Sequence, residues 1–232
     1  PPSAFAQAVQ EAFSSSAEAF ELPGIAWHVE RAGEVVEGVS GFTHAAHAAE
    51  RQPLSSSQRW HWGSCTKALS ATIVASLVDA GDIFPNGWDT AVGPLLGLTP
   101  KTPEGLGDVT LRQLAAHRGG VCLDLSPEEE SSLQAEFTAL DSSGGTKVTP
   151  KDQRAAFVRK LADKPLAHAP DKGYGYSNAG YVVLSAAAEA AAGQPWETLV
   201  ERLTKKLGMT TFGFGSPPRD LPGCGAVGHS ED

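Results

Sequence analysis

One stretch of this chain has the pattern of a β-hairpin, and most of the chain after it has apolar residues at helical spacing. Residues 25–30 and 34–39 are rich in β-branched side chains and flank Arg31-Ala-Gly33, a short turn with a glycine. Two strands alone form a marginal sheet in water, so this hairpin needs further strands or helix cover. We therefore predict an α/β (α+β) protein in which this antiparallel hairpin is completed by further strands or covered by flanking helices.

Helices are predicted on both sides of the hairpin from the spacing of apolar residues. In residues 3–20 the apolar side chains recur four apart, on one face. After Gly63 a buried helix is expected, with Leu69, Ile73 and Val74 inside it and Gly81 as its end. Capping boxes or terminal glycines indicate the remaining helices, which begin near Thr110, Ser126 and Thr149 or span 178–192 and 195–207.

Composition excludes several classes of protein. The 232 residues are 41% hydrophobic and 19% charged, as in globular proteins with a core. No apolar run approaches the roughly 18 to 20 residues of a membrane span, and the first residues lack a signal-peptide pattern. A net charge of -9 without a run of Lys and Arg argues against nucleic acid as a partner. Cys65, Cys122 and Cys224 are too widely spaced to imply a disulfide framework or a zinc site.

The first candidate site is the sequence Gly63-Ser-Cys-Thr-Lys67, at the start of a predicted helix. Ser64 and Lys67 are three residues apart, so their side chains project from one helix face, as a nucleophile and its base require. Free backbone N–H groups and the positive end of the helix dipole favour an anion near Ser64. A simple helix cap followed by a surface lysine fits the same residues.

The second candidate site is Tyr176-Ser-Asn178, at the start of another predicted helix. Two residues apart in an extended segment, the phenol and the carboxamide point the same way. The phenol could relay a proton while the amide orients a substrate carbonyl or the lysine. An ordinary loop with an asparagine cap is the alternative. Trp62, shortly before Ser64, could bind an apolar acyl group, although such aromatic residues more often belong to a core.

Together the two motifs resemble the serine β-lactamase and penicillin-binding-protein family, in which S-x-x-K is followed by S-D-N or Y-x-N. The tyrosine form is similar to the branch that holds class C β-lactamases, D-alanyl-D-alanine peptidases and related esterases. The resemblance covers about residues 22–214. Further landmarks of that branch occur in the expected order, namely Pro23–Ala26, Leu77–Gly81, Val109–Leu114 with His117, Tyr176–Leu184 and Leu207–Thr210.

The resemblance implies a β-lactamase-like two-lobed fold for residues 1–232 as a single domain. Residues 1–63 would form the helix and hairpin of one lobe, 64–214 a mostly helical lobe, and 215–232 an irregular tail. A small-molecule ester, amide or β-lactam would be the substrate, without a metal or cofactor. The resemblance is compatible with a periplasmic or secreted protein.

The resemblance also implies a role for each motif residue. Ser64 would be the acylated nucleophile, and its N–H would form half of an oxyanion hole. Lys67 would be its base or proton partner, and Tyr176 a second proton-transfer group. Asn178 would orient the substrate.

The third motif of the family, K-T-G, H-x-G or W-G-G, has no clear counterpart. Lys101-Thr-Pro103 precedes Tyr176 and has proline where glycine belongs, and His229-Ser-Glu231 lacks the glycine. We expect the missing strands to come from another polypeptide or a partner copy, or to have been removed. Two functions therefore stay open. One is a serine hydrolase acting through an acyl-enzyme, with esterase or peptidase activity favoured over β-lactamase activity. The other is a non-catalytic or incomplete member that acts as a binding module.

Overall fold

The computed structural model describes residues 1–43, 52–98, 105–143 and 147–215. Its internal contacts divide the chain into two units, Pro1–Gly63 with Thr211–Asp232, and Ser64–Thr210. The structure confirms the α/β class, with helices and an antiparallel sheet of two strands among the residues described. That these units form one domain over 1–232 stays a prediction.

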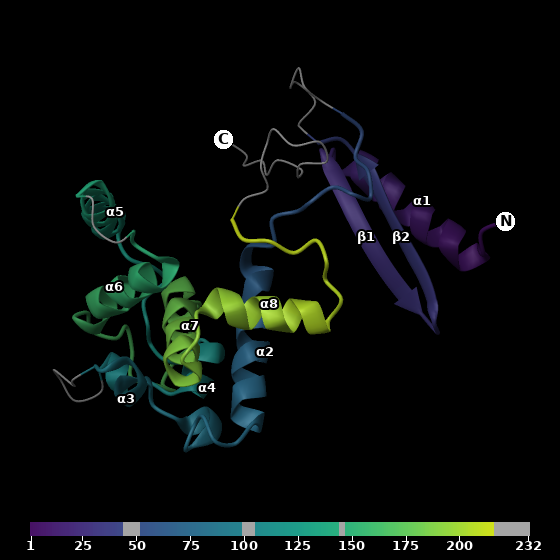
Figure 1. Cartoon of the computed structure of the whole chain (residues 1–232). Helices are drawn as coiled ribbons and strands as arrows, with labels where there is room; N and C mark the ends of the chain where they lie inside the picture. Colours follow the sequence, from purple (N-terminus) through teal and green to yellow (C-terminus); the bar gives the residue numbers. More distant parts are fainter. Residues whose placement is uncertain (44–51, 99–104, 144–146, 216–232) are drawn as a thin grey trace. The chain divides into compact units, whose positions relative to one another are not determined.

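The first unit consists of a helix and a hairpin. Helix α1 (Ala4–Ala19) lies along one face of strands β1 (Gly24–Arg31) and β2 (Glu34–Gly41) (Figure 1). The strands pair in an antiparallel register that runs from Gly24 opposite Gly41 to Arg31 opposite Glu34. The turn is Ala32-Gly33, and both residues have positive φ, 51° and 82°, as a tight hairpin turn of this hand requires. The predicted hairpin is confirmed, and each strand is two residues longer than predicted.

Contact between α1 and the sheet supplies the helix cover that a lone hairpin needs. The rings of Phe13 and Trp27 stack in parallel with centroids 5.2 Å apart, and Trp27 is buried. Ser3 caps the helix because its hydroxyl accepts the N–H of Ala6 at 3.0 Å. The apolar face predicted for residues 3–20 is therefore the face that packs on the strands.

In the second unit, the regular elements among the described residues are helices, joined by irregular connections. Its α-helices are α2 (Thr66–Asp79), α3 (Val92–Leu96), α4 (Leu111–Ala115), α5 (Pro127–Ser142), α6 (Pro150–Ala162), α7 (Asn178–Ala192) and α8 (Trp196–Lys206). The 3-10 helices are η1 (Gly63–Cys65), η2 (Gly87–Asp89) and η3 (Leu106–Asp108). The three predicted capping boxes, at Thr110, Ser126 and Thr149, are all present. The short helix α3 had no predicted counterpart.

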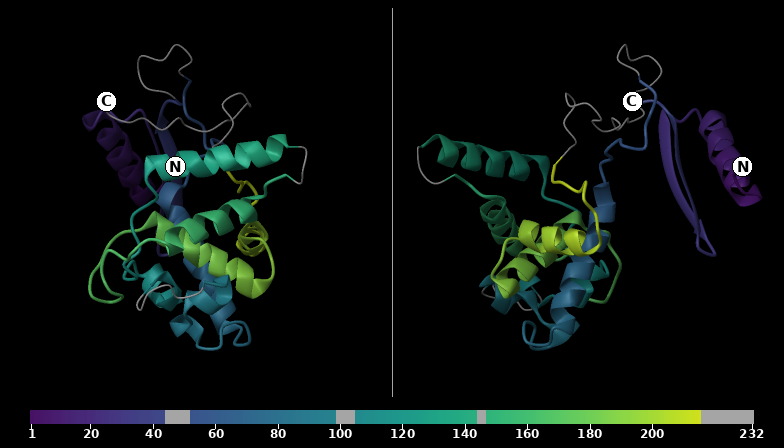
Figure 2. Two further views of the ribbon diagram at one scale, coloured as in Figure 1. Left: turned by 90° about the vertical axis from the view of Figure 1, so that its left-hand side faces the viewer. Right: turned by 45° about the vertical axis from the view of Figure 1, so that its right-hand side comes forward.

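Helix α7 is the centre of this unit. Nine of its fifteen residues are buried, and it contacts α2, α3, α4, α6 and α8. Figures 1 and 2 show these helices around α7, with α5 at the edge beside α6. Val183 and Leu184 are fully buried, and Gly193 ends the helix in the left-handed conformation at φ 63°. Since α7 begins at Asn178, a predicted site residue is anchored on the most buried helix.

A partly buried charge cluster ties α7 to its neighbours. Arg154 of α6 donates to both Glu189 of α7 and Glu197 of α8. The Glu189 side chain is 3% exposed and also accepts the backbone N–H of Trp196 at 2.9 Å. The guanidinium therefore holds the ends of three helices in one arrangement.

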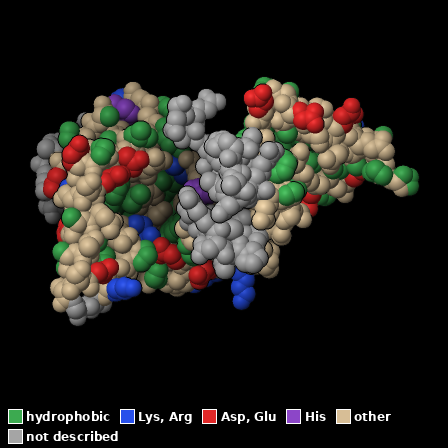
Figure 3. Space-filling model, turned by 90° about the horizontal axis from the view of Figure 1, so that it is seen from above, with side chains coloured by type: hydrophobic (Ala, Val, Ile, Leu, Met, Phe, Trp, Pro, Cys, Tyr) green, Lys and Arg blue, Asp and Glu red, His purple; other side chains and the backbone are tan. Residues whose placement is uncertain are grey.

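The surface of the described residues has mixed charge. On the face seen in Figure 3, Asp and Glu side chains are scattered among a few Lys and Arg, without a continuous basic area over the described part. None of the described helices is both long enough and apolar enough to cross a membrane.

Candidate active site

Ser64 and Lys67 meet at the start of α2. Ser64 lies in η1, immediately before the α-helix begins at Thr66, and its side chain is exposed. Lys67, one turn further on, is half-buried and donates from Nζ to Ser64 Oγ at 3.3 Å. The spacing therefore produces the contact that a shared helix face predicts.

Two residues from far along the chain join this pair. Tyr176 donates from its hydroxyl to Ser64 Oγ at 2.8 Å. Asn178 Oδ1 accepts from Lys67 Nζ at 2.7 Å. Four predicted site residues therefore form one hydrogen-bonded group, in which Ser64 Oγ accepts hydrogen bonds from both the Lys67 ammonium and the Tyr176 phenol.

Aromatic rings surround the ammonium of this group. Lys67 Nζ lies 4.7 Å from the ring centroid of Tyr176 and 5.7 Å from that of Tyr181. The Lys67 ammonium, followed by the hydrogen bond to Ser64, lowers the pKa of the Tyr176 phenol below its usual value. Burial instead raises the pKa of Tyr181, whose hydroxyl donates to the Ala115 carbonyl at 2.9 Å. The two phenols therefore differ, because the pKa of Tyr176 is lowered beside Ser64 and that of Tyr181 is raised by burial.

The segment before α7 is held in place by backbone contacts. The Ser177 hydroxyl donates to the Cys122 carbonyl at 2.5 Å and accepts the N–H of Gly180 at 2.7 Å, which caps the helix. The N–H of Asn178 donates to the Leu123 carbonyl at 2.9 Å. These bonds fix the direction in which Tyr176 and Asn178 leave the backbone.

His117 is a site residue whose role sequence reasoning missed. Its ring packs against the rings of Tyr176 and Tyr181, with centroids 4.5 and 5.1 Å apart. Its Nδ1 accepts the N–H of Ser177 at 3.1 Å, so this nitrogen is unprotonated. Burial, followed by the nearby Lys67, lowers the pKa of His117. In the sequence, His117 stood out only as one of the family landmarks. That observation did not predict that its ring would pack against Tyr176 and Tyr181.

Asp124 is a second missed residue. Its Oδ2 accepts from Asn178 Nδ2 at 2.8 Å, and the side chain is half-buried. It lies in the connection between α4 and α5, outside both motifs. A single acid in a loop carries no pattern that would have marked it.

The remaining sequence candidates lie in the first unit or outside the described residues. Trp62 belongs to the first unit, where its ring packs edge-on against Phe212 with centroids 6.0 Å apart. It is 43% exposed, and its role in binding an acyl group stays a prediction. Lys101-Thr-Pro103 and His229-Ser-Glu231 lie outside the described residues.

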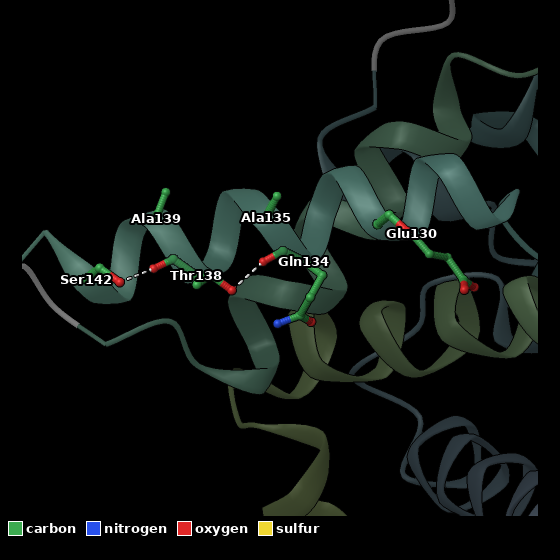
Figure 4. A pocket seen from close by; sticks show the side chains of 7 residues that line it. Glu130, Gln134, Ala135, Thr138, Ala139 and Ser142 are labelled. Atoms are coloured by element: carbon green, nitrogen blue, oxygen red, sulfur yellow. Dashed lines mark hydrogen bonds between the residues drawn. The ribbon is translucent and has the colours of Figure 1, made fainter.

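Other features of the described residues offer no competing site. Within these ranges, no group of three or more His, Cys, Asp and Glu side chains is placed to hold a metal ion. A hollow of about 810 Å³ follows α5 and is open to solvent (Figure 4). In it, Thr138 and Ser142 donate to carbonyls of their own helix at 2.8 and 2.7 Å. It is lined by α5 alone and holds none of the Ser64 group.

Comparisons with known proteins identify the family of this chain. The family model described as Beta-lactamase matches residues 9–232. Penicillin-binding protein 4 of Amycolatopsis lactamdurans is 30% identical over 86% of this chain and 47% of its own length. Esterase EstB of Burkholderia gladioli is 30% identical over 84% of this chain and 48% of its own length.

A solved structure has a similar fold. The crystal structure of SurE superposes with a TM-score of 0.70 at 26% identity, over 95% of this chain and 43% of SurE. The chain spans about half the length of the penicillin-binding protein and of the esterase. From the family match over nearly its whole length, the chain belongs to the Beta-lactamase family.

Proposed function

We propose that this chain carries the nucleophile of a serine hydrolase that forms an acyl-enzyme at Ser64 and hydrolyses an ester or amide. The observation that carries the proposal is that Ser64 Oγ accepts from both Lys67 and Tyr176, at 3.3 and 2.8 Å. Either neighbour, once deprotonated, could take the serine proton. The named relatives include a penicillin-binding protein and an esterase, which supports this class of reaction.

The reaction would proceed in two balanced steps. Ser64 Oγ attacks the substrate carbonyl carbon while its proton passes to Lys67 or Tyr176. The C–O or C–N bond to the leaving group breaks, and the departing alcohol or amine takes up that proton. Water then attacks the acyl-serine in the same way, which releases the acid and returns a proton to Ser64.

Two further groups would support these steps. The N–H of Ser64, in the first turn of η1, would donate to the oxyanion, a contribution of a few kcal/mol in such sites. Asn178 would hold Lys67 and orient the substrate carbonyl. A second oxyanion donor would come from a segment outside the described residues or from a partner chain, and native mass spectrometry tests for the partner.

The test is covalent labelling together with turnover. The protein is incubated with a chromogenic short-chain ester and with a chromogenic cephalosporin, beside Ser64→Ala and the control Ser76→Ala on the exposed face of α2. We expect a mass increment and a hydrolysis rate in the wild type and in Ser76→Ala, and neither in Ser64→Ala. Comparing the hydrolysis rates of the ester and the cephalosporin would distinguish esterase from β-lactamase activity. Absence of both signals in the wild type would reject the hydrolase and favour a non-catalytic binding module.

A further inference from the structure

The carboxylate of Asp124 contacts the side chain that holds Lys67. Asp124 Oδ2 accepts from Asn178 Nδ2 at 2.8 Å, and Asn178 Oδ1 accepts from Lys67 Nζ at 2.7 Å. Lys67 in turn contacts Ser64. A continuous chain of hydrogen bonds therefore runs from a half-buried carboxylate to the nucleophile.

The chemistry of the two neighbours fixes which way the Asn178 amide points. A lysine ammonium can only donate, and an ionised carboxylate can only accept. If the amide were rotated by 180°, its N–H would face the ammonium of Lys67 and its oxygen would face Asp124, so both bonds would be lost. Asp124, which contacts the end of the Asn178 amide away from Lys67, therefore opposes this rotation of the amide. One of the two amide N–H bonds is used on Asp124, which leaves the other for a substrate carbonyl.

We propose that Asp124 is a positioning residue of the acylation site, which keeps the oxygen of the Asn178 amide on Lys67 and one of its N–H groups available to substrate. This inference rests on the proposed function, because it assigns Asp124 to the same reaction. Without Asp124 the amide can rotate, and Lys67 loses its fixed acceptor. A hydrogen bond to a charged group is strong enough to favour one orientation of the amide, since a tenfold preference between two orientations needs only about 1.4 kcal/mol.

The hydrogen bond can be tested directly, without any assay of activity. The chain has only two asparagines, Asn86 and Asn178, so selective ¹⁵N labelling of asparagine gives two pairs of side-chain amide proton signals by NMR. We expect one Asn178 amide proton to exchange with solvent about tenfold more slowly than its partner. In Asp124→Ala this difference should vanish, while Asn86 serves as the internal reference.

Two variants control this measurement. Asp79→Ala removes the same charge from the far end of α2, about 18 Å from Lys67 along the helix, without adding a labelled asparagine, and should leave the Asn178 signals unchanged. Asp124→Asn keeps an acceptor oxygen and should retain most of the slow exchange of Asn178, even if Asp124→Ala folds poorly. Its own labelled side chain adds a third pair of signals, which the wild-type spectrum lacks. An Asn178 signal that is identical in the wild type, Asp124→Asn and Asp124→Ala overturns the inference.

A double-mutant cycle on ester hydrolysis then tests the catalytic consequence. Asp124→Ala should lower kcat/KM at least tenfold in the wild type but less than twofold when Asn178 is already alanine, because Asp124 acts through Asn178. An equal loss in both backgrounds would mean that Asp124 acts on the fold or on substrate directly, and would refute the positioning role. If the wild type shows no adduct at Ser64, the proposed function fails, and the NMR comparison still decides whether Asp124 orients Asn178.

Discussion

Replacing Arg154 by methionine should destabilise the helical unit by several kcal/mol. The guanidinium donates to Glu189 at 2.9 and 2.7 Å, and to Glu197 at 2.7 and 2.8 Å. The Arg154 side chain is 16% exposed and that of Glu189 is 3% exposed. Burial alone lowers the pKa of Arg154, but the two carboxylates outweigh it and raise the pKa overall. The positive charge of Arg154 therefore compensates the neighbouring Glu189 and Glu197 carboxylates.

The loss of stability in Arg154→Met depends on the buried negative charge that remains without its partner. Methionine keeps an apolar stem but leaves the Glu189 carboxylate buried, with the N–H of Trp196 still donating to it. Breaking a buried pair in this way costs about 3 to 5 kcal/mol. For a unit of this size that corresponds to a fall in melting temperature on the order of 10 °C. Thermal unfolding followed by far-UV circular dichroism measures it.

Two controls separate burial from charge loss in general. Arg112→Met breaks the ion pair with Asp89, whose side chains are 60% and 67% exposed, and should leave the melting temperature nearly unchanged. Adding Glu189→Met to Arg154→Met removes the stranded charge and should recover most of the loss. If Arg154→Met melts within about 2 °C of the wild type, the argument from the buried carboxylate is refuted.

Three further predictions concern the site and its support. Tyr176→Phe should lower kcat/KM for ester hydrolysis at least a hundredfold, because a positioned proton-transfer group is lost, and an unchanged rate would exclude that role. Since the fold lowers the pKa of His117, the unfolded chain takes up this proton first as pH falls. The wild type should therefore lose stability below about pH 6.5 that His117→Gln does not lose, as urea unfolding at pH 7.5 and 5 would measure. Gly120→Ala should cost roughly 2 kcal/mol or more, because φ is +72° and the new Cβ would lie 2.0 Å from the His168 carbonyl oxygen. The same change at Gly193, which has φ +63° and no atom within 4 Å of the new Cβ, should cost less in the same unfolding assay.

Local interactions explain which elements the sequence predicts well. The capping boxes at Thr110, Ser126 and Thr149 satisfy N–H groups within a few residues, so their signal needs no tertiary context. The contact of Lys67 with Ser64 follows from helix geometry in the same way. The helix α3 escaped prediction because five residues are too few to show a period.

From the sequence, the contact of Tyr176 and Asn178 with the Ser64 motif could be predicted only from the family resemblance. Tyr176 reaches Ser64 across 112 residues, and no property of either segment specifies that contact. The motifs suggest the pairing only through the family resemblance, which implies that the two motifs share one site. In the structure the pairing comes from α7, which is buried against α2 and begins at Asn178.

By itself, the sequence determined the hairpin, most of the longer helices, and that a hydroxyl and an amine share one helix turn, because these features depend on neighbours a few residues apart. The tertiary structure alone decided that Asp124 holds the Asn178 amide and that His117 lies against Tyr176. Those contacts join loops and helices distant in the chain, and they form because the buried faces of several helices pack together. An acid in a loop acquires its partner only through that packing.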